Sequence, residues 1–256
     1  MKYKITTNYA PLTLCVKVTA STPTKVYLRV YDAQDKTRRF TDRYKTVTGE
    51  EMFYIRMPLS PDISVVEVTG ANGAQEGTFN LVSVTKKPLE RRIDVNDIGN
   101  SNIRSFVKFA QKFSFNLGNL ETNTTYRSDD GMFLIQLVPK IQSRDGRPLA
   151  TPARIGRKTG IIQVSKSSFE KFTIPMRLAI LLHEFSHFYL NEQIDNEMEA
   201  DLNGLLIYLG LGYPRIEAYQ AFLETFKDSP SALNKQRYDI INKFINDFES
   251  MNMVIQ

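Results

Sequence analysis

The first 85 residues of the chain alternate apolar and polar positions in short runs, whereas the remainder repeats apolar positions at helical spacing. Alternation with a period of two predicts half-buried β-strands. Turn-forming residues such as Ser21-Thr22-Pro23 separate the runs, and this spacing predicts an all-β, sandwich-like domain over residues 1–85. The expected strands are Lys2 to Thr6, Leu12 to Ala20, Lys25 to Asp32, Glu51 to Met57, Ser64 to Thr69 and Thr78 to Thr85.

A charged stretch over residues 86–102, with Pro88 and Gly99, predicts a linker, and a second domain is expected over residues 103–256. Buried strands are predicted in this second domain at Met132 to Ile141 and at Gly160 to Ser165. The sequence therefore predicts an α+β protein of two domains. The expected helices are Ile103 to Phe113, Thr173 to Leu190, a segment starting at Asn196, Tyr213 to Phe226 and Ala232 to Phe248.

The composition is that of an ordinary globular protein, with 42% hydrophobic and 24% charged residues in a chain of 256. The single cysteine, Cys15, excludes an internal disulfide and is expected to be a small buried residue. The start of the chain does not read as a signal peptide, and no run approaches the roughly 18 apolar residues of a membrane helix. We expect no membrane partner and a cytoplasmic protein, or a particle-associated one if it belongs to a virion.

Charge is spread unevenly along the second domain. Residues 101–180 carry 13 Lys and Arg against 5 Asp and Glu, whereas residues 181–256 carry 5 against 12. The two segments either attract each other within one domain or present a basic surface to an acidic partner or substrate. Nucleic acid is not an expected partner, because no binding motif or interleaved aromatic residue accompanies the charge. The basic surface would include Arg144, Arg147, Arg154, Arg157 and Lys158.

The only two histidines stand four residues apart in His183-Glu184-Phe185-Ser186-His187, which reads H-E-x-x-H. Residues i and i+4 of a helix lie one above the other, so both imidazoles can face one metal ion. Glu184 lies on a neighbouring face, beside the metal, where its carboxylate could take a proton from bound water. Thr173 as N-cap and Pro175 in the first turn support a helix around the motif.

A zinc site that keeps one position for water needs a third protein ligand. The chain has no third histidine, and the segment Asn196-Glu197-Met198-Glu199-Ala200-Asp201 opens the next predicted helix. Glu197 and Asp201 share a helical face, so one can bind the metal while the other accepts a hydrogen bond from a ligand imidazole. The simpler interpretation is a solvated helix start, since acidic residues favour the first turn.

Taken together, H-E-F-S-H and N-E-M-E-A-D resemble the zinc metallopeptidases of the gluzincin type, whose second motif reads E-x-x-x-D. The resemblance covers about twenty residues and implies a zincin-like domain with Zn²⁺ held by His183, His187 and Glu197. It further implies that Glu184 is the general base and acid and that Asp201 is the partner of His183.

The chain departs from the gluzincin pattern in two ways. The interval between the motifs is short for the family, and no histidine remains to stabilise the oxyanion. Tyr208, Tyr213 and Arg215 are the candidates for that task by their proximity in sequence. In zincin folds the strand before the metal helix is an edge strand, which implies that Ile161 to Ser165 would pair with an extended substrate.

Two functions remain open on the sequence. The first is a zinc-dependent metallopeptidase that hydrolyses a peptide or protein substrate. The second is a structural or assembly component of a large complex, such as a phage virion, that uses a metallopeptidase-type fold with or without activity. In either case the N-terminal β-domain is expected either to dock protein partners or to serve as a passive stabilising domain, and the chain could act as an oligomer in a larger assembly.

Overall fold

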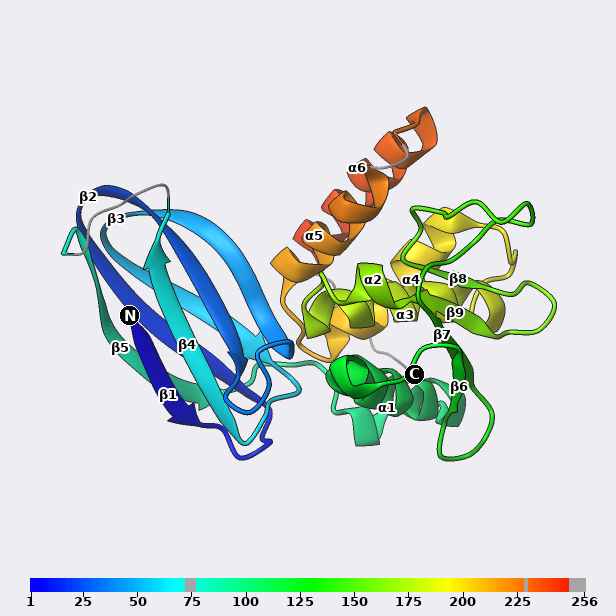
Figure 1. Ribbon diagram of the computed structural model, residues 1–256, viewed down its shortest axis with the longest axis horizontal. Coiled ribbons are helices and arrows are strands. Elements are labelled where there is room, and N and C mark those ends of the chain that lie inside the picture. The colour runs from blue at the N-terminus through cyan, green and yellow to red at the C-terminus, as the bar shows by residue number, and fades with distance from the viewer. Residues whose placement is uncertain (72–76, 228–229, 249–256) are drawn as a thin grey trace. The chain divides into compact units, whose positions relative to one another are not determined.

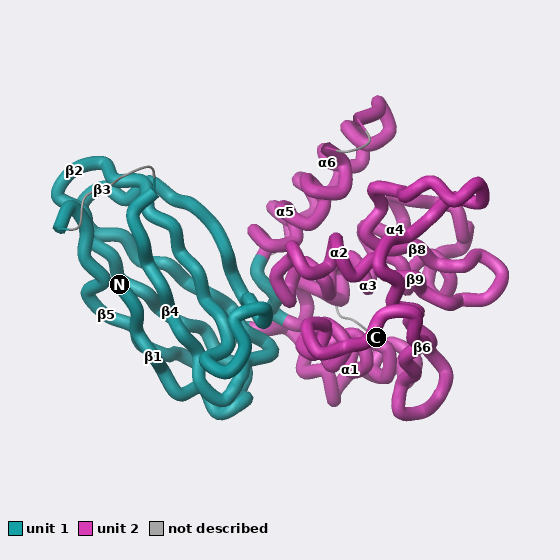
Figure 2. The backbone as a smooth tube through the Cα atoms, viewed as in Figure 1, with its two compact units in different colours: residues 1–90, 212–214 teal, residues 91–211, 215–256 magenta. Residues whose placement is uncertain are grey.

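The computed structural model describes residues 1–71, 77–227 and 230–248, and it contains both β-sheets and helices (Figure 1). The predicted α+β class is therefore confirmed. The chain divides into two compact units (Figure 2): residues 1–90 with 212–214, and residues 91–211 with 215–256. Residues 249–256, the end of the predicted second domain, lie outside the described residues.

The first unit is built around one long strand, β2, which pairs with β3 along almost its whole length. On its other edge β2 pairs first with β5 and then with β4, and β1 adds to β4. All pairs are antiparallel and belong to one five-stranded sheet. The strands are β1 (Lys2–Thr6), β2 (Leu12–Asp32), β3 (Arg39–Met57), β4 (Ile63–Gly70) and β5 (Phe79–Pro88).

This single sheet corrects the prediction of a sandwich with six separate strands. Ser21-Thr22-Pro23 does not end a strand but forms an irregularity inside β2. From Ala20 to Thr24 the strand advances four residues, while its partners in β3 advance only from Gly49 to Val47. Such a bulge bends a strand without ending it. A single strand can therefore pair with β5 before the bulge and with β4 after it.

The bulge also preserves the buried face of the first unit. Because the extra residues number two, the alternation of side chains continues unchanged across it. The even-numbered residues of β2 are buried both before and after the bulge. Cys15 lies on the opposite face and is half-buried, whereas the sequence predicted a buried residue. The buried residues of β2 that share this face are Leu14, Val16, Val18, Val26, Leu28 and Val30.

The second unit contains a four-stranded sheet in the order β6-β7-β9-β8. Strands β7 and β9 are parallel, and the two outer strands pair antiparallel to them. The expectation that Ile161 to Ser165 would form an edge strand was wrong, because β9 lies between β7 and β8, and β8 forms the edge on that side. The strands are β6 (Thr124–Arg127), β7 (Leu134–Val138), β8 (Ala153–Ile155) and β9 (Ile162–Ser165).

The helices of the second unit follow the predicted order, and the predicted linker 86–102 contains the end of β5, a short 3-10 helix and the start of α1. Among the described residues no helix is both long and apolar enough to cross a bilayer. The helices are η1 (Val95–Asp97), α1 (Ser101–Asn116), η2 (Leu117–Asn119), α2 (Lys166–Phe169), α3 (Ile174–Tyr189), α4 (Glu197–Gly210), α5 (Arg215–Phe226) and α6 (Ala232–Asp247).

Helix α3 is the central element of the second unit and packs against α1, α4, α5 and β8. Thr173 caps it through the backbone N–H of Met176, as predicted. Arg177, in the first turn of α3, is only 1% exposed. Nε of Arg177 donates to the Phe169 carbonyl at 2.8 Å, and Nη1 donates to the Ser114 carbonyl at 2.7 Å. Helix α3 is thus fixed to α1 and α2 by hydrogen bonds as well as by packing.

Candidate metal centre

The two histidines of α3 face the same point, as their spacing of four residues predicts. Their Nε2 atoms are 3.1 Å apart and their ring planes are nearly perpendicular, at 88°. His187 is 2% exposed, and His183 is partly buried. Both rings are therefore held inside the protein with one nitrogen each directed at a common position.

Glu197, at the first position of α4, supplies a carboxylate to this position. Its Oε1 lies 3.4 Å from Nε2 of His187, and its Oε2 lies 3.5 Å from Nε2 of His183. Ligands at roughly 2.0–2.1 Å from a tetrahedral zinc ion are separated from one another by about 3.3–3.4 Å. The observed separations of 3.1, 3.4 and 3.5 Å match that spacing, so these side chains can surround a metal ion.

The outer ring nitrogens both lie close to oxygen atoms away from the metal position. Nδ1 of His187 donates to the Ile194 carbonyl at 2.8 Å, so its Nε2 carries a lone pair whenever the ring is neutral. Nδ1 of His183 is 2.8 Å from Oδ1 of Asp201, although the N–H bond does not point along that line. Lone pairs of two imidazoles and a carboxylate repel one another unless a cation lies between them. The donor set therefore fits a metal ion.

Electrostatics at this position favour positive charge. Burial lowers the pKa of His183, but the carboxylates of Asp201 and Glu197 outweigh burial and raise that pKa to about 10. Burial alone would raise the pKa of Glu197, but its contacts with His183 and His187 outweigh burial and hold that pKa well below its usual range. The surrounding carboxylates thus stabilise a cation at the histidines, whether a proton or a metal ion.

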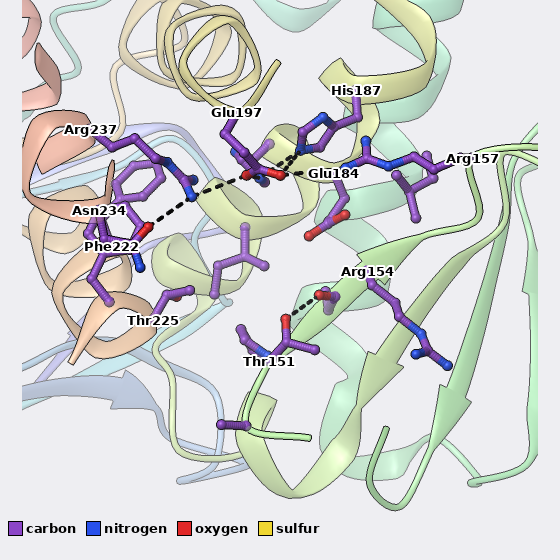
Figure 3. Close-up of a pocket in the computed structure, with 17 residues that line it drawn as sticks. Thr151, Arg154, Arg157, Glu184, His187, Glu197, Phe222, Thr225, Asn234 and Arg237 are labelled. Atoms are coloured by element: carbon purple, nitrogen blue, oxygen red, sulfur yellow. Dashed lines mark hydrogen bonds and ion pairs between the residues drawn. The ribbon is translucent and has the colours of Figure 1, made fainter. Parts of the chain in front are cut away.

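Glu184 lies on the wall of the same cavity, next to the imidazoles, as expected (Figure 3). Burial raises the pKa of its carboxyl, and the nearby His183 and His187 lower it in part. Glu184 stands outside the group whose ligand atoms converge, which consists of His183, His187 and Glu197. It is therefore placed to exchange protons with a molecule in the cavity rather than to bind the metal.

Arg237, from α6, completes the site and was missed in the sequence. It donates to both oxygens of Asp201, from Nε at 2.7 Å and from Nη2 at 2.9 Å, and its Nη1 lies 3.2 Å from Oε2 of Glu197. The guanidinium also stacks on Phe226 at 4.7 Å. The sequence could have indicated Arg237 by its position, because it stands four residues before Ile241 and therefore lies on the buried face of an amphipathic helix.

Arg157 stabilises the short turn between the two motif helices. Its Nη1 donates to the Ile194 carbonyl at 2.5 Å, its Nε lies 3.2 Å from Asp195, and its Nη2 lies 3.5 Å from Oε1 of Glu197. The Ile194 carbonyl therefore accepts from both Arg157 and His187. These contacts explain how a turn of a few residues can bring Glu197 back to the histidines.

The cavity over the metal position has a volume of about 450 Å³. One wall is β8 with the segment before it, and the other is formed by α5 and α6. None of the residues proposed to stabilise an oxyanion lines this cavity: Tyr208 and Tyr213 are buried, and Arg215 is exposed at the start of α5. The polar residues that line it outside the metal position are Thr151, Arg154, Arg157, Thr225, Asn234 and Arg237.

Helix α4 lies against the backbone of α3 at Gly204, which predicts the effect of a substitution there. A Cβ atom at Gly204 would lie 2.9 Å from the backbone nitrogen of His183. Gly204→Ala is therefore expected to push the helices apart, to destabilise the fold by about 1–3 kcal/mol and to weaken metal binding. Thermal unfolding and a zinc titration test this; unchanged affinity would show that the helices do not need this approach.

Comparison with family models, curated proteins and solved structures finds no match for this chain.

Proposed function

We propose that the chain is a zinc-dependent peptidase. The observation that carries the proposal is the convergence of His183, His187 and Glu197 at one position, with Glu184 beside it in a cavity. Two imidazoles and one carboxylate are a common ligand set of catalytic zinc, which leaves the fourth position open. The two helices that carry these residues, and a small sheet whose edge strand β8 pairs with no further described strand, also agree with a zincin-like domain.

Zinc at this position would polarise the scissile carbonyl and lower the pKa of a water molecule. Glu184 would accept a proton from that water as its oxygen bonds to the carbonyl carbon, and would deliver the proton to the amine nitrogen as the C–N bond breaks. Asp201 would orient His183, and the Ile194 carbonyl would orient His187. Arg237 and Arg157 line the cavity and lie 3.2 and 3.5 Å from the carboxylate oxygens of Glu197, and either cation would stabilise negative charge on the substrate.

The substrate backbone would pair with β8. Pro152 and Gly156 direct their backbone groups toward β9, through the bonds Ser165 N to Pro152 O and Gly156 N to Ile161 O. By alternation, the backbone groups of Ala153 and Ile155 point to the other edge, which no described strand covers. An extended peptide could add to this edge by β-augmentation beside the metal position.

Metal content and activity test the proposal together. We expect about one zinc per chain in the wild type, hydrolysis of a proteome-derived peptide mixture, and loss of hydrolysis on chelation with recovery on adding zinc. His187→Ala should lose both metal and activity. Phe188→Ala is the matched control, since this neighbour on α3 is 37% exposed and does not line the cavity.

A wild-type protein that binds no zinc after supplementation would refute the proposal. Zinc binding without cleavage of any peptide, in a stable ring or particle-bound form, would favour the assembly role instead. Equal zinc content in His187→Ala and the wild type would show that the metal lies elsewhere.

A further inference from the structure

The outer face of the β6–β9 sheet carries a line of polar side chains that ends at the metal cavity. Gln136 on β7, Gln163 on β9 and Arg154 on β8 are aligned by the strand register. The Gln163 amide donates to Oε1 of Gln136 at 3.0 Å, and its own Oε1 accepts from Nε of Arg154 at 3.1 Å. The guanidinium of Arg154 is thus oriented through Nε, while its two terminal nitrogens remain to bind a ligand.

Arg154 lies where two hollows of the second unit meet. It lines the metal cavity and also a second, open hollow of about 760 Å³. In Figure 3 its side chain runs away from Glu184. The second hollow also contains Lys140, Gln142 and Asn123 and has no carboxylate in its described lining. A ligand that extends from the metal cavity past β8 would therefore meet positive charge.

The guanidinium of Arg154 is exposed and has no acidic partner in the described part of the chain. This distinguishes it from Arg157 and Arg237, which also line the cavity but are paired with Asp195, Glu197 and Asp201. An exposed arginine with a fixed Nε and free terminal nitrogens is suited to bind a carboxylate in bidentate fashion.

Strand geometry defines which substrate residue Arg154 would meet. In an added antiparallel strand, the residue directly opposite Arg154 places its side chain on the same face of the sheet. That face holds Gln136 and Gln163, whereas the neighbours Ala153 and Ile155 are buried on the other face. Arg154 would therefore contact the side chain at one substrate position, and the side chains on either side of that position would point to the other face of the sheet.

We propose that this site selects peptide substrates with an acidic side chain at the position opposite Arg154. The proposal rests on the proposed peptidase function. It also gives a role to part of the excess of basic residues between 101 and 180, in which Lys and Arg number 13 and Asp and Glu number 5.

The test is the cleavage profile of the zinc-loaded, full-length protein on a proteome-derived peptide library. We expect Asp and Glu to be enriched at one position, and kcat/KM for a Glu peptide to exceed that for its Gln counterpart by roughly tenfold, the effect of a charge-assisted hydrogen bond. Arg154→Gln should remove this preference, and Arg154→Glu should invert it toward Lys and Arg. Arg144→Glu is the matched control, because Arg144 is also exposed and lines neither hollow.

The outcomes separate the two proposals. Cleavage by the wild type without enrichment of Asp or Glu, or an unchanged preference in Arg154→Glu, would overturn acidic selection and leave the peptidase intact. The same inversion in Arg144→Glu would overturn it too, because it would assign the effect to overall charge. No cleavage of any peptide by the zinc-loaded wild type would refute the peptidase function, and acidic selection with it.

Discussion

Replacing Glu184 with glutamine is expected to reduce peptide hydrolysis by about a hundred- to ten-thousand-fold, the contribution typical of a general acid and base. Glutamine has nearly the same shape but cannot accept and release the proton. Because Glu184 stands outside the ligand group of His183, His187 and Glu197, zinc content and the thermal unfolding temperature should remain close to those of the wild type. The measurement is kcat on one cleaved peptide, alongside metal analysis of the same sample.

Glu199→Gln is the matched control for this experiment. Glu199 lies in the second motif, but its carboxylate accepts from the backbone N–H of Glu192 at 2.8 Å and does not line the cavity. Its substitution should leave kcat within a fewfold of the wild type. Full activity in Glu184→Gln would remove Glu184 from the mechanism, and loss of zinc in that variant would mean that its carboxylate helps to hold the metal.

Arg177→Leu is expected to lower the free energy of unfolding of the second unit by about 3–5 kcal/mol. The substitution leaves the buried carbonyls of Phe169 and Ser114 without the donors that Arg177 supplies, and each unsatisfied group costs about 1–3 kcal/mol. The reason for the arginine is geometric, since one guanidinium reaches from α3 to both α1 and the end of α2.

Urea unfolding followed by circular dichroism measures this loss. Lys108→Leu provides the control, because it replaces an exposed cation on α1 and should change stability by no more than about 0.5 kcal/mol. An unfolding midpoint of Arg177→Leu equal to that of the wild type would show that water or a rearranged helix satisfies the two carbonyls.

Local patterns predicted those parts of the site that local geometry determines. The spacing of His183 and His187 on one helix requires both rings to face one position, and the cap at Thr173 marked where that helix begins. Asn196 likewise caps α4 at the residue before Glu197. These relations involve residues within one or two helical turns, so no tertiary information was needed.

Contacts between distant segments could not be derived in this way. Arg237 reaches Asp201 across 36 positions of sequence, and Arg157 reaches Glu197 across 40. Strand β8 has only three residues, which is too short for an alternating pattern, and it forms because β9 offers an edge. The run from Ser21 to Pro23 resembled a turn because its local sequence does not show that pairing with the distant strand β3 continues past it.

The carbonyl of Ile194 accepts from the ligand His187 and from Arg157, and it belongs to the backbone rather than to a side chain. Many residue types at position 194 would present the same oxygen, so evolution could vary that residue widely while the number of residues in the turn stayed fixed. One inserted residue would move this oxygen out of reach of both donors. In related chains, constant turn length should therefore identify the site better than constant turn sequence.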